Sequence, residues 1–377
     1  MDRKLKTLQL LPALEQGGVE RGVVEMNRVI SAAGWENVVV SAGGRLADQI
    51  ARDGGRHVVL DVKSKNPLTY LSRAAALRRL LESERPDVVC AHSRVPAWLF
   101  MGANRRLKIP WITFAHGANS VSPYSRVMTY GDLVVTPSQY IAGYLREAYG
   151  TPEAKMRVIP RAIERERFDP ARLDLGFADA KRAEWGVAGR KVAMALGRIT
   201  QLKGFDILVR AAALLPPEYM VVIVGEAEEL RKDVEASLRE LVSALGLGGR
   251  VVFAGNQSKV AECLSIADVV VSSNVRKPEA FGRSMAEALA MGRPVVARAF
   301  GGALDVVRDG RDGVLVRGEG AADWPALFAE AIRRAAAMPR EGLRESALER
   351  FSFERMAESS LAAYREAASG KGKEESR

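Results

Sequence analysis

Two glutamates eight positions apart, Glu279 and Glu287, have the spacing in this chain that points most directly to chemistry. Phe281-Gly282 lies between them and precedes a sequence typical of a helix that begins at Arg283. The N-terminus of a helix attracts anions because its first backbone N–H groups have no partner within the helix. Carboxylates beside such an anion site need another partner, and the hydroxyl groups of a sugar and a ribose meet that need. A capping box formed by Ser284 and Glu287 is the alternative interpretation.

Two basic side chains follow an apolar run in the same half of the chain. Arg198 and Lys203 lie between Gly197 and Gly204, directly after the predicted strand Lys191–Leu196. A glycine after a strand allows a tight turn, and these two cations can reach one diphosphate group. The alternative is that both are ordinary surface residues.

Polar residues also follow predicted strands in the first half. His116 comes after the apolar strand Trp111–Phe114, and His92 and Arg94 come after Val88–Ala91. Because parallel sheets bind ligands at the carboxyl ends of their strands, we expect His116 to point into a cleft. Arg94 is a weaker candidate that suits an anionic acceptor. A structural role for His116, with its ring nitrogens satisfied by the fold, is the alternative.

Gly17 and Gly18 follow the first predicted strand and open the first predicted helix. Their spacing is not that of G-x-G-x-x-G, so no dinucleotide site is predicted, and a plain tight turn is the alternative to a binding role. Arg161 follows Pro160 near the end of the first half. It is a candidate for reaching a diphosphate or an acidic acceptor.

Short runs rich in Val and Ile alternate with amphipathic helical stretches, which is typical of parallel sheets covered on both faces. The strands expected in the first half are Lys6–Leu11, Asn37–Ser41, His57–Asp61, Val88–Ala91, Trp111–Phe114, Leu133–Thr136 and Arg157–Pro160. Those expected in the second half are Lys191–Leu196, Tyr219–Val224, Arg250–Phe253, Asp268–Ser272, Pro294–Ala297 and Gly313–Val316. The helices expected are Val19–Ala33, Phe205–Leu215, Ala227–Leu245, Lys259–Ile266, Arg283–Met291, Asp323–Ala337 and Glu354–Ala368. The pattern predicts an α/β protein with two tandem Rossmann-like domains, joined by an irregular connection over Arg161–Ala171.

The chain has 377 residues, of which 47% are hydrophobic and 27% charged, a composition typical of globular proteins in water. It has no uncharged apolar stretch of about 18 residues, so we expect no membrane span. The short apolar run near the N-terminus is interpreted as a strand and not as a signal peptide. Cys90 and Cys263 lie in apolar contexts, and we expect buried thiols in a reducing cytosol. With three histidines and no ligand cluster in the sequence, no metal site is predicted.

The net charge of +10 is concentrated in the first half of the chain. Residues 1–170 hold 25 Lys and Arg against 17 Asp and Glu, and the remainder holds 31 against 29. Basic residues stand beside apolar ones in the segments 70–81 and 98–108, which suits an anionic membrane surface. A solvated basic face is the alternative. Nucleic acid is not expected as a partner, since no basic cluster is interleaved with stacking aromatics.

The order of these motifs resembles that of the retaining glycosyltransferases of the GT-B fold, of the group 1 or family 4 type. The resemblance rests on residues 276–302, is supported by 197–204 and 16–21, and extends over about residues 6–368. It implies an N-terminal acceptor-side domain over 1–170, a nucleotide-sugar-binding domain over 171–351 and a cleft between them. It also implies a crossover helix over 352–368 that packs back on the first domain, and we expect a disordered tail over 369–377. The form Pro278-Glu-Ala-Phe-Gly-Arg283 is most similar to bacterial enzymes that build lipopolysaccharide or surface glycans.

The resemblance assigns expected roles to individual residues. It implies that Glu279 binds hydroxyls of the donor sugar and Glu287 the ribose, while Arg198 and Lys203 bind the leaving diphosphate and His116 lies near the reacting sugar. The further donor-binding residues that we expect are Gly17, Gly18, Phe281, Gly282 and Arg283. The family reaction needs no cofactor, no metal and no dedicated protein base. Its donor is a nucleotide-diphosphate-sugar, with a UDP-sugar favoured here, and its acceptor a glycan or glycolipid.

These expectations describe a cytoplasmic enzyme at the inner face of the cytoplasmic membrane. Two other activities keep the fold: an epimerase or phosphorylase-like enzyme acting on a nucleotide-sugar, and a non-catalytic protein that binds a sugar nucleotide or a membrane. The presence of Arg198, Lys203, Glu279 and Glu287 together argues for catalysis. The identity of the sugar, the linkage and the oligomeric state are left open.

Overall fold

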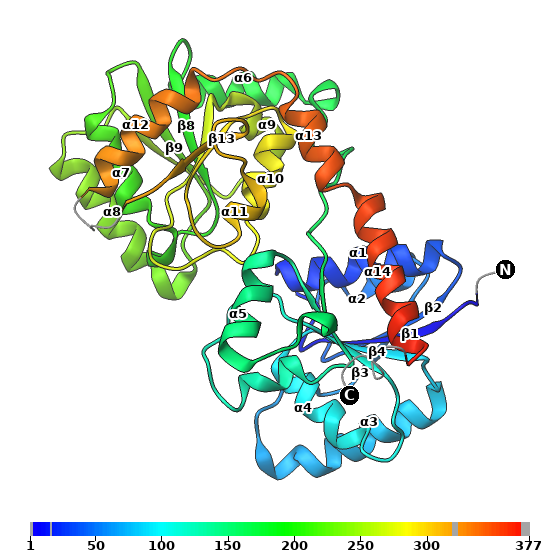
Figure 1. Cartoon of the computed structure of the whole chain (residues 1–377). Helices are drawn as coiled ribbons and strands as arrows, with labels where there is room; N and C mark the ends of the chain where they lie inside the picture. Colours follow the sequence, from blue (N-terminus) through cyan, green and yellow to red (C-terminus); the bar gives the residue numbers. More distant parts are fainter. Residues whose placement is uncertain (1–2, 16, 319–322, 371–377) are drawn as a thin grey trace. The chain divides into compact units, whose positions relative to one another are not determined.

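The computed structural model of the protein describes residues 3–15, 17–318 and 323–370. Its contacts define two compact units, each described here by itself (Figure 1). The first unit comprises the chain up to Arg161 and again from Glu354, and the second unit is Ala162–Phe353. The chain therefore leaves the first unit once and returns to it through its C-terminal helix.

The first unit is built on a sheet of seven parallel strands in the order β3-β2-β1-β4-β5-β6-β7. Its strands are β1 (Lys6–Leu10), β2 (Glu36–Ser41), β3 (Arg56–Val59), β4 (Val88–Ala91), β5 (Trp111–Phe114), β6 (Leu133–Thr136) and β7 (Met156–Val158). Its helices are α1 (Gly18–Ala32), α2 (Ala47–Arg52), α3 (Tyr70–Glu84), α4 (Arg94–Ala103), α5 (Gln139–Tyr149) and α14 (Phe353–Ala368), with the short 3₁₀ turns η1 (Pro67–Thr69), η2 (Ser125–Thr129) and η3 (Glu153–Lys155).

The second unit is built on a sheet of six parallel strands in the order β10-β9-β8-β11-β12-β13. Its strands are β8 (Lys191–Leu196), β9 (Tyr219–Val224), β10 (Val251–Gly255), β11 (Val269–Ser272), β12 (Val295–Arg298) and β13 (Gly313–Val316). Its helices are α6 (Leu175–Glu184), α7 (Phe205–Leu214), α8 (Lys232–Ala244), α9 (Val260–Ile266), α10 (Arg283–Ala290), α11 (Ala303–Val306), α12 (Trp324–Ala336) and α13 (Leu343–Arg350), with the 3₁₀ turns η4 (Pro170–Arg172), η5 (Gln201–Lys203) and η6 (Glu229–Arg231).

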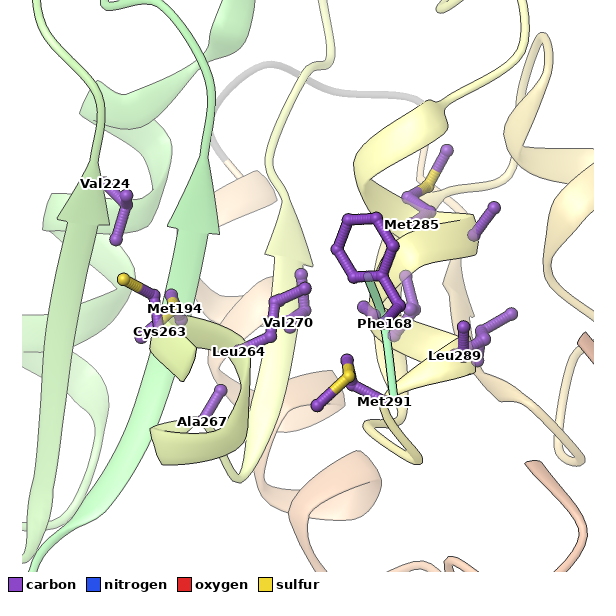
Figure 2. Close-up of a cluster of buried hydrophobic side chains, with 14 of the residues drawn as sticks. Phe168, Met194, Val224, Cys263, Leu264, Ala267, Val270, Met285, Leu289 and Met291 are labelled. Carbon is purple, nitrogen blue, oxygen red and sulfur yellow. The ribbon is translucent and has the colours of Figure 1, made fainter. Parts of the chain in front are cut away.

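Each sheet is covered on both faces because successive strand residues point to opposite sides. In the second unit one face packs against α6, α9, α10 and α13, and the other packs against α7, α8 and α12. Figure 2 shows the first of these cores, where Met194 and Val270 of the sheet meet Leu264 of α9 and Met285 of α10. Burial of such side chains contributes roughly 1.5–3 kcal/mol each to folding. This core holds α10 against the sheet.

The expectation of two Rossmann-like α/β domains is confirmed, and several strands, such as Val88–Ala91, have the predicted bounds. The long helix expected over Ala227–Leu245 is wrong at its start, since η6 precedes α8 and α8 begins at Lys232. Five helices were not predicted: α2, α4, α6, α11 and α13. The expected tail over 369–377 lies outside the described residues from position 371 onward.

The charged segment expected as an irregular connection is anchored in the second unit. Ile163 and Phe168 are 2% and 1% exposed and belong to the core of that unit (Figure 2 labels Phe168). The backbone N–H of Ile163 donates to the carbonyl of Phe351 at 2.9 Å. Two apolar residues among many charged ones are enough to anchor a segment, although they leave no periodic signal in the sequence.

The prediction that both cysteines are buried thiols is confirmed. Cys90 and Cys263 are buried and form no disulfide. Burial raises the pKa of Cys263 to about 12 and raises that of Cys90 as well. Neither sulfur is therefore a thiolate at neutral pH.

Candidate active site

The candidate residues lie where parallel sheets bind ligands, at the carboxyl ends of the strands beside a change in strand order. In the first sheet that change falls between β1 and β4, and in the second between β8 and β11. Gly17 and Gly18 follow β1, and Arg94 follows β4. Lys203 follows β8 and Glu279 follows β11. The two clusters belong to different units.

The loops after β8 and β11 meet through one ion pair in the second unit. The Nζ atom of Lys203 donates to Oε1 of Glu279 at 2.6 Å, and both side chains are little more than a quarter exposed. Gly204 has a φ of 65°, and a Cβ atom there would lie 2.1 Å from the carbonyl oxygen of Ser273. The absent side chain therefore lets the Lys203 loop approach the end of β11. The Ser273 hydroxyl also donates to the Lys203 carbonyl at 3.2 Å.

Arg198 and Lys203 have different partners. The Arg198 side chain is 74% exposed and forms an ion pair with Glu228, which follows β9. Glu228 was not predicted as a site residue, and it stands in an acidic run with Glu226 and Glu229. Each of the two cations is therefore paired with a carboxylate from another loop.

The Phe281-Gly282 turn is fixed from the core side. The Phe281 ring is 5% exposed and packs edge-on against Phe351 at a centroid distance of 5.4 Å. The N-cap of α10 is Gly282, and the backbone N–H of Gly302 donates to the Glu279 carbonyl at 2.8 Å. The Phe281 side chain is thus part of the core, and what it can offer a ligand is backbone.

The capping-box interpretation of Ser284 and Glu287 is wrong. The helix α10 begins at Arg283, so Ser284 lies inside its first turn, and no side chain caps the helix. The Glu287 carboxylate instead lies 3.3 Å from Nε of Arg283. Nη2 of the same arginine lies 3.6 Å from the Glu164 carboxylate. The Glu287 side chain is 15% exposed, and this burial raises the pKa of its carboxyl. The second glutamate of the motif is therefore a shielded carboxylate and not a cap.

A chain of hydrogen bonds runs through the first unit and fixes the tautomers of two histidines. An arginine can only donate, so Nδ1 of His116 accepts from Nη2 of Arg161 at 2.7 Å. The single ring proton of neutral His116 is then on Nε2, which donates to Nδ1 of His92 at 3.1 Å. By the same reasoning Nε2 of His92 donates to Oε1 of Gln9 at 2.7 Å. Gln9 in turn donates to the Tyr364 hydroxyl of α14, at 3.4 Å.

Strand periodicity explains why these residues share one face of the sheet. Leu8 and Leu10 of β1 pack toward α3 and α4, which leaves Gln9 on the opposite side. His92 and His116 continue the alternation of β4 and β5 onto the side of Gln9. Tyr364 reaches the same side from the C-terminal helix. Gln9 and Tyr364 were not predicted, although a glutamine within an apolar strand is a signal that could have been used.

Both histidines are held in their neutral form. Burial, together with the positive charge of Arg161, lowers the pKa of His92 to about 3 and lowers that of His116 well below its ordinary value. The His92 ring is 5% exposed, whereas His116 is half-buried. His116 therefore cannot act as a cationic acid at neutral pH, and both of its ring nitrogens already have partners.

The two candidate arginines of the first unit are also engaged. The guanidinium of Arg161 lies against α1, where a Cβ atom at Gly22 would come within 2.1 Å of Nη1. Arg94 donates to the Ser125 hydroxyl at 3.0 Å and lies over the Tyr124 ring at 5.3 Å from its centroid. Arg161 thus lies between His116 and α1, whereas Arg94 lies beside the loop that contains Tyr124.

The glycine turn after β1 has ordinary backbone angles. Gly17 is the N-cap of α1 with a φ of −73°, and Gly18 is the first residue of that helix. Within residues 3–15, 17–318 and 323–370 no group of three or more potential metal ligands is present. The same part of the chain contains no helix that is both long and apolar enough to cross a membrane.

Comparison with known proteins matches both units to glycosyltransferase families. Residues 178–349 match the family described as glycosyl transferases group 1, and residues 16–167 match glycosyltransferase family 4. A D-inositol 3-phosphate glycosyltransferase from Geodermatophilus obscurus is 31% identical over 336 residues, which cover 81% of this chain and 73% of that protein.

Solved structures agree with this context. A glycosyltransferase from Rickettsia africae has a TM-score of 0.88 at 26% identity, with 97% of this chain and 99% of that chain covered. An Anabaena protein solved in complex with UDP has a TM-score of 0.81 at 22% identity, with 95% and 99% covered. The fold is the GT-B type, with one Rossmann-like domain in each unit.

Proposed function

Since this chain belongs to the group 1 and family 4 glycosyltransferases, we propose that it transfers a sugar from a nucleotide-diphosphate-sugar to an acceptor hydroxyl with retention of anomeric configuration. The observation that supports this most directly is the contact between Lys203 and Glu279 beside the N-terminus of α10. It puts a cation and a carboxylate on neighbouring loops of one sheet, next to the start of a helix.

The donor side of the proposal uses the second unit. The diphosphate binds Lys203, Arg198 and the backbone N–H groups at the start of α10, since each supplies positive charge or a donor. Glu279, once Lys203 turns to phosphate, accepts hydrogen bonds from the sugar hydroxyls. Glu287 accepts bonds from the ribose. The Anabaena neighbour was solved with UDP, which supports a UDP-sugar as the donor.

The proposed reaction needs one bond made and one broken at the anomeric carbon. The bond from that carbon to the diphosphate oxygen breaks and its electrons stay on the phosphate, which leaves as the nucleoside diphosphate. The acceptor oxygen forms the new bond, and its proton passes to a phosphate oxygen of the donor. Lys203 and Arg198 stabilise the growing negative charge without a divalent metal.

The acceptor side of the proposal uses the first unit, where Arg94 and Arg161 supply positive charge. The relative from Geodermatophilus obscurus is named for D-inositol 3-phosphate, which supports an acceptor that carries phosphate. A lipopolysaccharide or other surface-glycan acceptor, as expected from the Pro278–Arg283 motif, is the alternative. We propose that the enzyme works in the cytoplasm, at the inner face of the membrane.

A panel of nucleotide diphosphates and nucleotide-sugars, read by thermal shift, tests the donor assignment. A ligand that binds only the folded protein raises the melting temperature, by an amount that follows its affinity. We expect UDP and one UDP-sugar to give the largest shifts, and turnover to continue in excess EDTA. Proton NMR of the first product formed gives the anomeric configuration. An inverted product, no shift with any nucleotide, or a Mg²⁺-restorable loss of activity in EDTA would each contradict the corresponding part.

A further inference from the structure

A cavity of about 440 Å³ lies in the first unit, away from the residues so far assigned to the donor. Its walls include Tyr70 of α3, Val95, Trp98 and Leu99 of α4, and Tyr124 of the loop before η2. This volume lies within the range of roughly 300–1,000 Å³ typical of small-molecule sites. The walls are mostly aromatic and aliphatic.

The polar ring atoms of Tyr70 and Trp98 are already used by the protein. The Tyr70 hydroxyl donates to the Trp98 carbonyl at 3.1 Å, and the Trp98 indole N–H donates to the Tyr124 carbonyl at 2.9 Å. These two rings are therefore fixed by bonds at their polar ends. What they offer to an occupant of the cavity is apolar surface.

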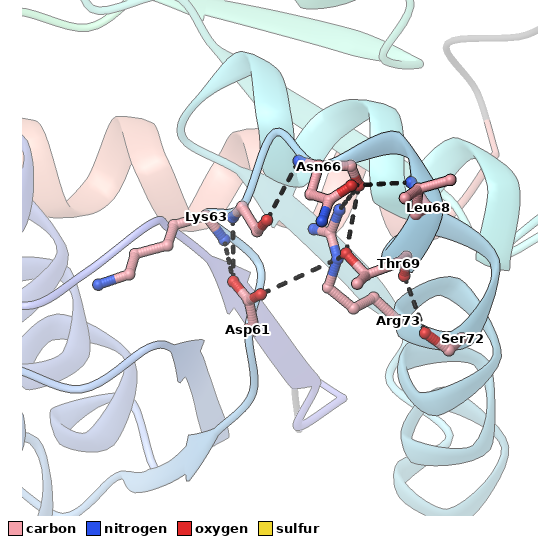
Figure 3. A network of polar contacts seen from close by, with 8 residues as sticks. Asp61, Lys63, Asn66, Leu68, Thr69, Ser72 and Arg73 are labelled. Atoms are coloured by element: carbon pink, nitrogen blue, oxygen red, sulfur yellow. Dashed lines mark hydrogen bonds and ion pairs between the residues drawn. The ribbon is translucent and has the colours of Figure 1, made fainter.

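Arg73 lies in the wall of the same cavity and has no close anionic partner. Its side chain is 9% exposed. Nε donates to the Thr69 hydroxyl at 3.0 Å and Nη2 to the Asn66 carbonyl at 3.1 Å, while the buried Nη1 has no hydrogen-bond partner. Figure 3 shows this arrangement, with Asp61 nearest to the Nε atom that also contacts Thr69.

Asp61 compensates this charge poorly. Its carboxylate lies 3.9 Å from Nε of Arg73, and its side chain is 49% exposed. Its Oδ1 atom also accepts the backbone N–H groups of Lys63 and Ser64. When the nearest carboxylate to a buried cation is distant and exposed to solvent, an anion that enters the site stabilises the cation. Lys65, also in the cavity wall, adds a second positive charge.

The cavity also adjoins the expected acceptor side of the enzyme. Tyr124 forms part of its wall and carries the Arg94 guanidinium on its ring. Arg94 is the first residue of α4, and only His92 and Ser93 separate it from the end of β4. An occupant of the cavity would therefore be one residue away from the candidate acceptor cation.

From this combination of apolar walls, a buried guanidinium and contact with Arg94 through Tyr124, we propose that the cavity binds the hydrocarbon and adjoining anionic group of a lipid-linked acceptor. The proposal rests on the proposed function and names the acceptor class for it. The chain segment next to the anionic group occupies the space between Tyr70, Trp98 and Tyr124, and the anion pairs with Arg73. A small phosphorylated polyol would leave those walls without contact.

The test uses the full-length protein and decyl phosphate, kept below its micelle concentration, with binding followed by calorimetry. Inorganic phosphate, decanol and decyltrimethylammonium separate the contributions of charge and chain. We expect decyl phosphate to bind at least tenfold more tightly than each of the three. Equal affinity for decanol would overturn the role of Arg73, and no binding of decyl phosphate would overturn the site.

Two variants locate the binding. Val95→Trp fills the cavity and is expected to weaken decyl phosphate binding at least tenfold, whereas Ala51→Trp on the exposed face of α2 leaves it unchanged. Arg73→Met is expected to abolish the preference for decyl phosphate over decanol, whereas Arg52→Met retains it. Should Arg73→Met not fold, Val95→Trp still decides. Unchanged affinity in folded Val95→Trp would contradict the proposal.

UDP affinity is measured in every variant, so that a failure of the lipid-acceptor proposal can be distinguished from a failure of the donor-site proposal. Normal UDP binding without decyl phosphate binding would remove the acceptor class and leave the glycosyltransferase proposal intact. A third outcome is that the protein binds anionic vesicles, that Val95→Trp does not change this binding, and that monomeric decyl phosphate does not bind. That outcome would assign this surface to membrane contact and overturn the cavity site.

Discussion

Nδ1 of His92 accepts a hydrogen bond from Nε2 of His116 at 3.1 Å. The protonated ring nitrogen of His116 therefore faces another histidine and not open solvent. This relationship follows from the arginine on the far side of His116, which can only donate. It makes the two rings one unit with defined tautomers. A substrate that needs a donor from His116 must therefore break this contact first.

The neutral state of His92 predicts a specific pH dependence of stability. Its pKa is lowered from 6.5 to about 3 in the folded protein, so the unfolded chain binds more protons below pH 6.5. Stability from this group is present above pH 6.5 and is lost as pH falls toward 3. His92→Gln, which does not titrate, should show a smaller fall in melting temperature between pH 7 and pH 5. An identical fall in parent and variant would contradict the assignment.

Removal of either donor-side cation should slow transfer with little effect on folding. We expect Lys203→Ala and Arg198→Ala each to raise the barrier by about 2–4 kcal/mol, the usual effect of losing a donor to a developing anion. Their ion pairs are partly or largely exposed, so the change in unfolding free energy should be at most about 1 kcal/mol. Steady-state kinetics and chemical denaturation measure the two. Arg210→Ala, an exposed cation on α7, is the control, and near-parent turnover in both test variants would remove the diphosphate assignment.

Substitution of the two glutamates of the motif should affect different measurements, UDP affinity for Glu287 and turnover for Glu279. Glu287→Gln should weaken UDP binding, because bonds to a charged acceptor contribute about 1.5–3 kcal/mol against about 1 kcal/mol for a neutral one. Glu279→Gln should instead lower turnover with the complete sugar donor and leave UDP affinity near the parent value. Calorimetry with UDP and kinetics with the UDP-sugar distinguish them. Parent-like values for both variants would mean that the spacing of the two residues is coincidental.

Glu287 also has a stability signature of its own. Burial raises the pKa of its carboxyl above 4.5, so the folded protein binds the proton more tightly than the unfolded chain does. That contribution is fully present below pH 4.5 and is lost as pH rises through the raised pKa. Glu287→Gln should therefore gain stability relative to the parent as pH increases from 4.5 to 7. The same denaturation series at both pH values shows whether it does.

The basic residues of the first unit should bring the protein to anionic vesicles. Arg105 and Arg106 are exposed after α4, and Leu68 and Leu71 are 91% and 78% exposed near the start of α3. Each basic residue near an anionic surface contributes about 1 kcal/mol, and salt weakens the attraction. Sedimentation with anionic vesicles should fall on adding salt and in the double variant Arg105→Glu/Arg106→Glu. The matched pair Arg333→Glu/Arg334→Glu in the second unit should have little effect, and equal binding to neutral vesicles would oppose the idea.

The sequence was sufficient for features that depend on local periodicity. The strands Trp111–Phe114 and Leu133–Thr136 have the predicted bounds, because each is a short apolar run between turn residues. The carboxyl ends of these strands then indicated where His116 would stand. Periodicity does not report which side chains are paired with which, so the partners of Arg198 and Lys203 came from the structure.

Long-range partners were the harder part of the site. Gln9 and Tyr364 are 355 positions apart, and their contact depends on how the C-terminal helix packs on β1. The capping box failed for a different reason. Ser284 has the right identity and spacing, but the helix begins at Arg283, as expected, so its N-cap is Gly282 and Ser284 lies inside the first turn. The identity and spacing of two residues do not by themselves make one of them the cap.

The return of the C-terminal helix makes the first unit depend on two distant stretches of chain. Tyr364 is fully buried in the first unit, and Glu366 pairs with Arg157 there, with an Nε to Oε2 distance of 3.0 Å. The second unit is one contiguous segment, Ala162–Phe353, so every residue that it needs comes from a single stretch. A chain cut after position 353 would therefore keep all of the second unit, while Gln9 and Arg157 of the first unit would lose their partners from α14.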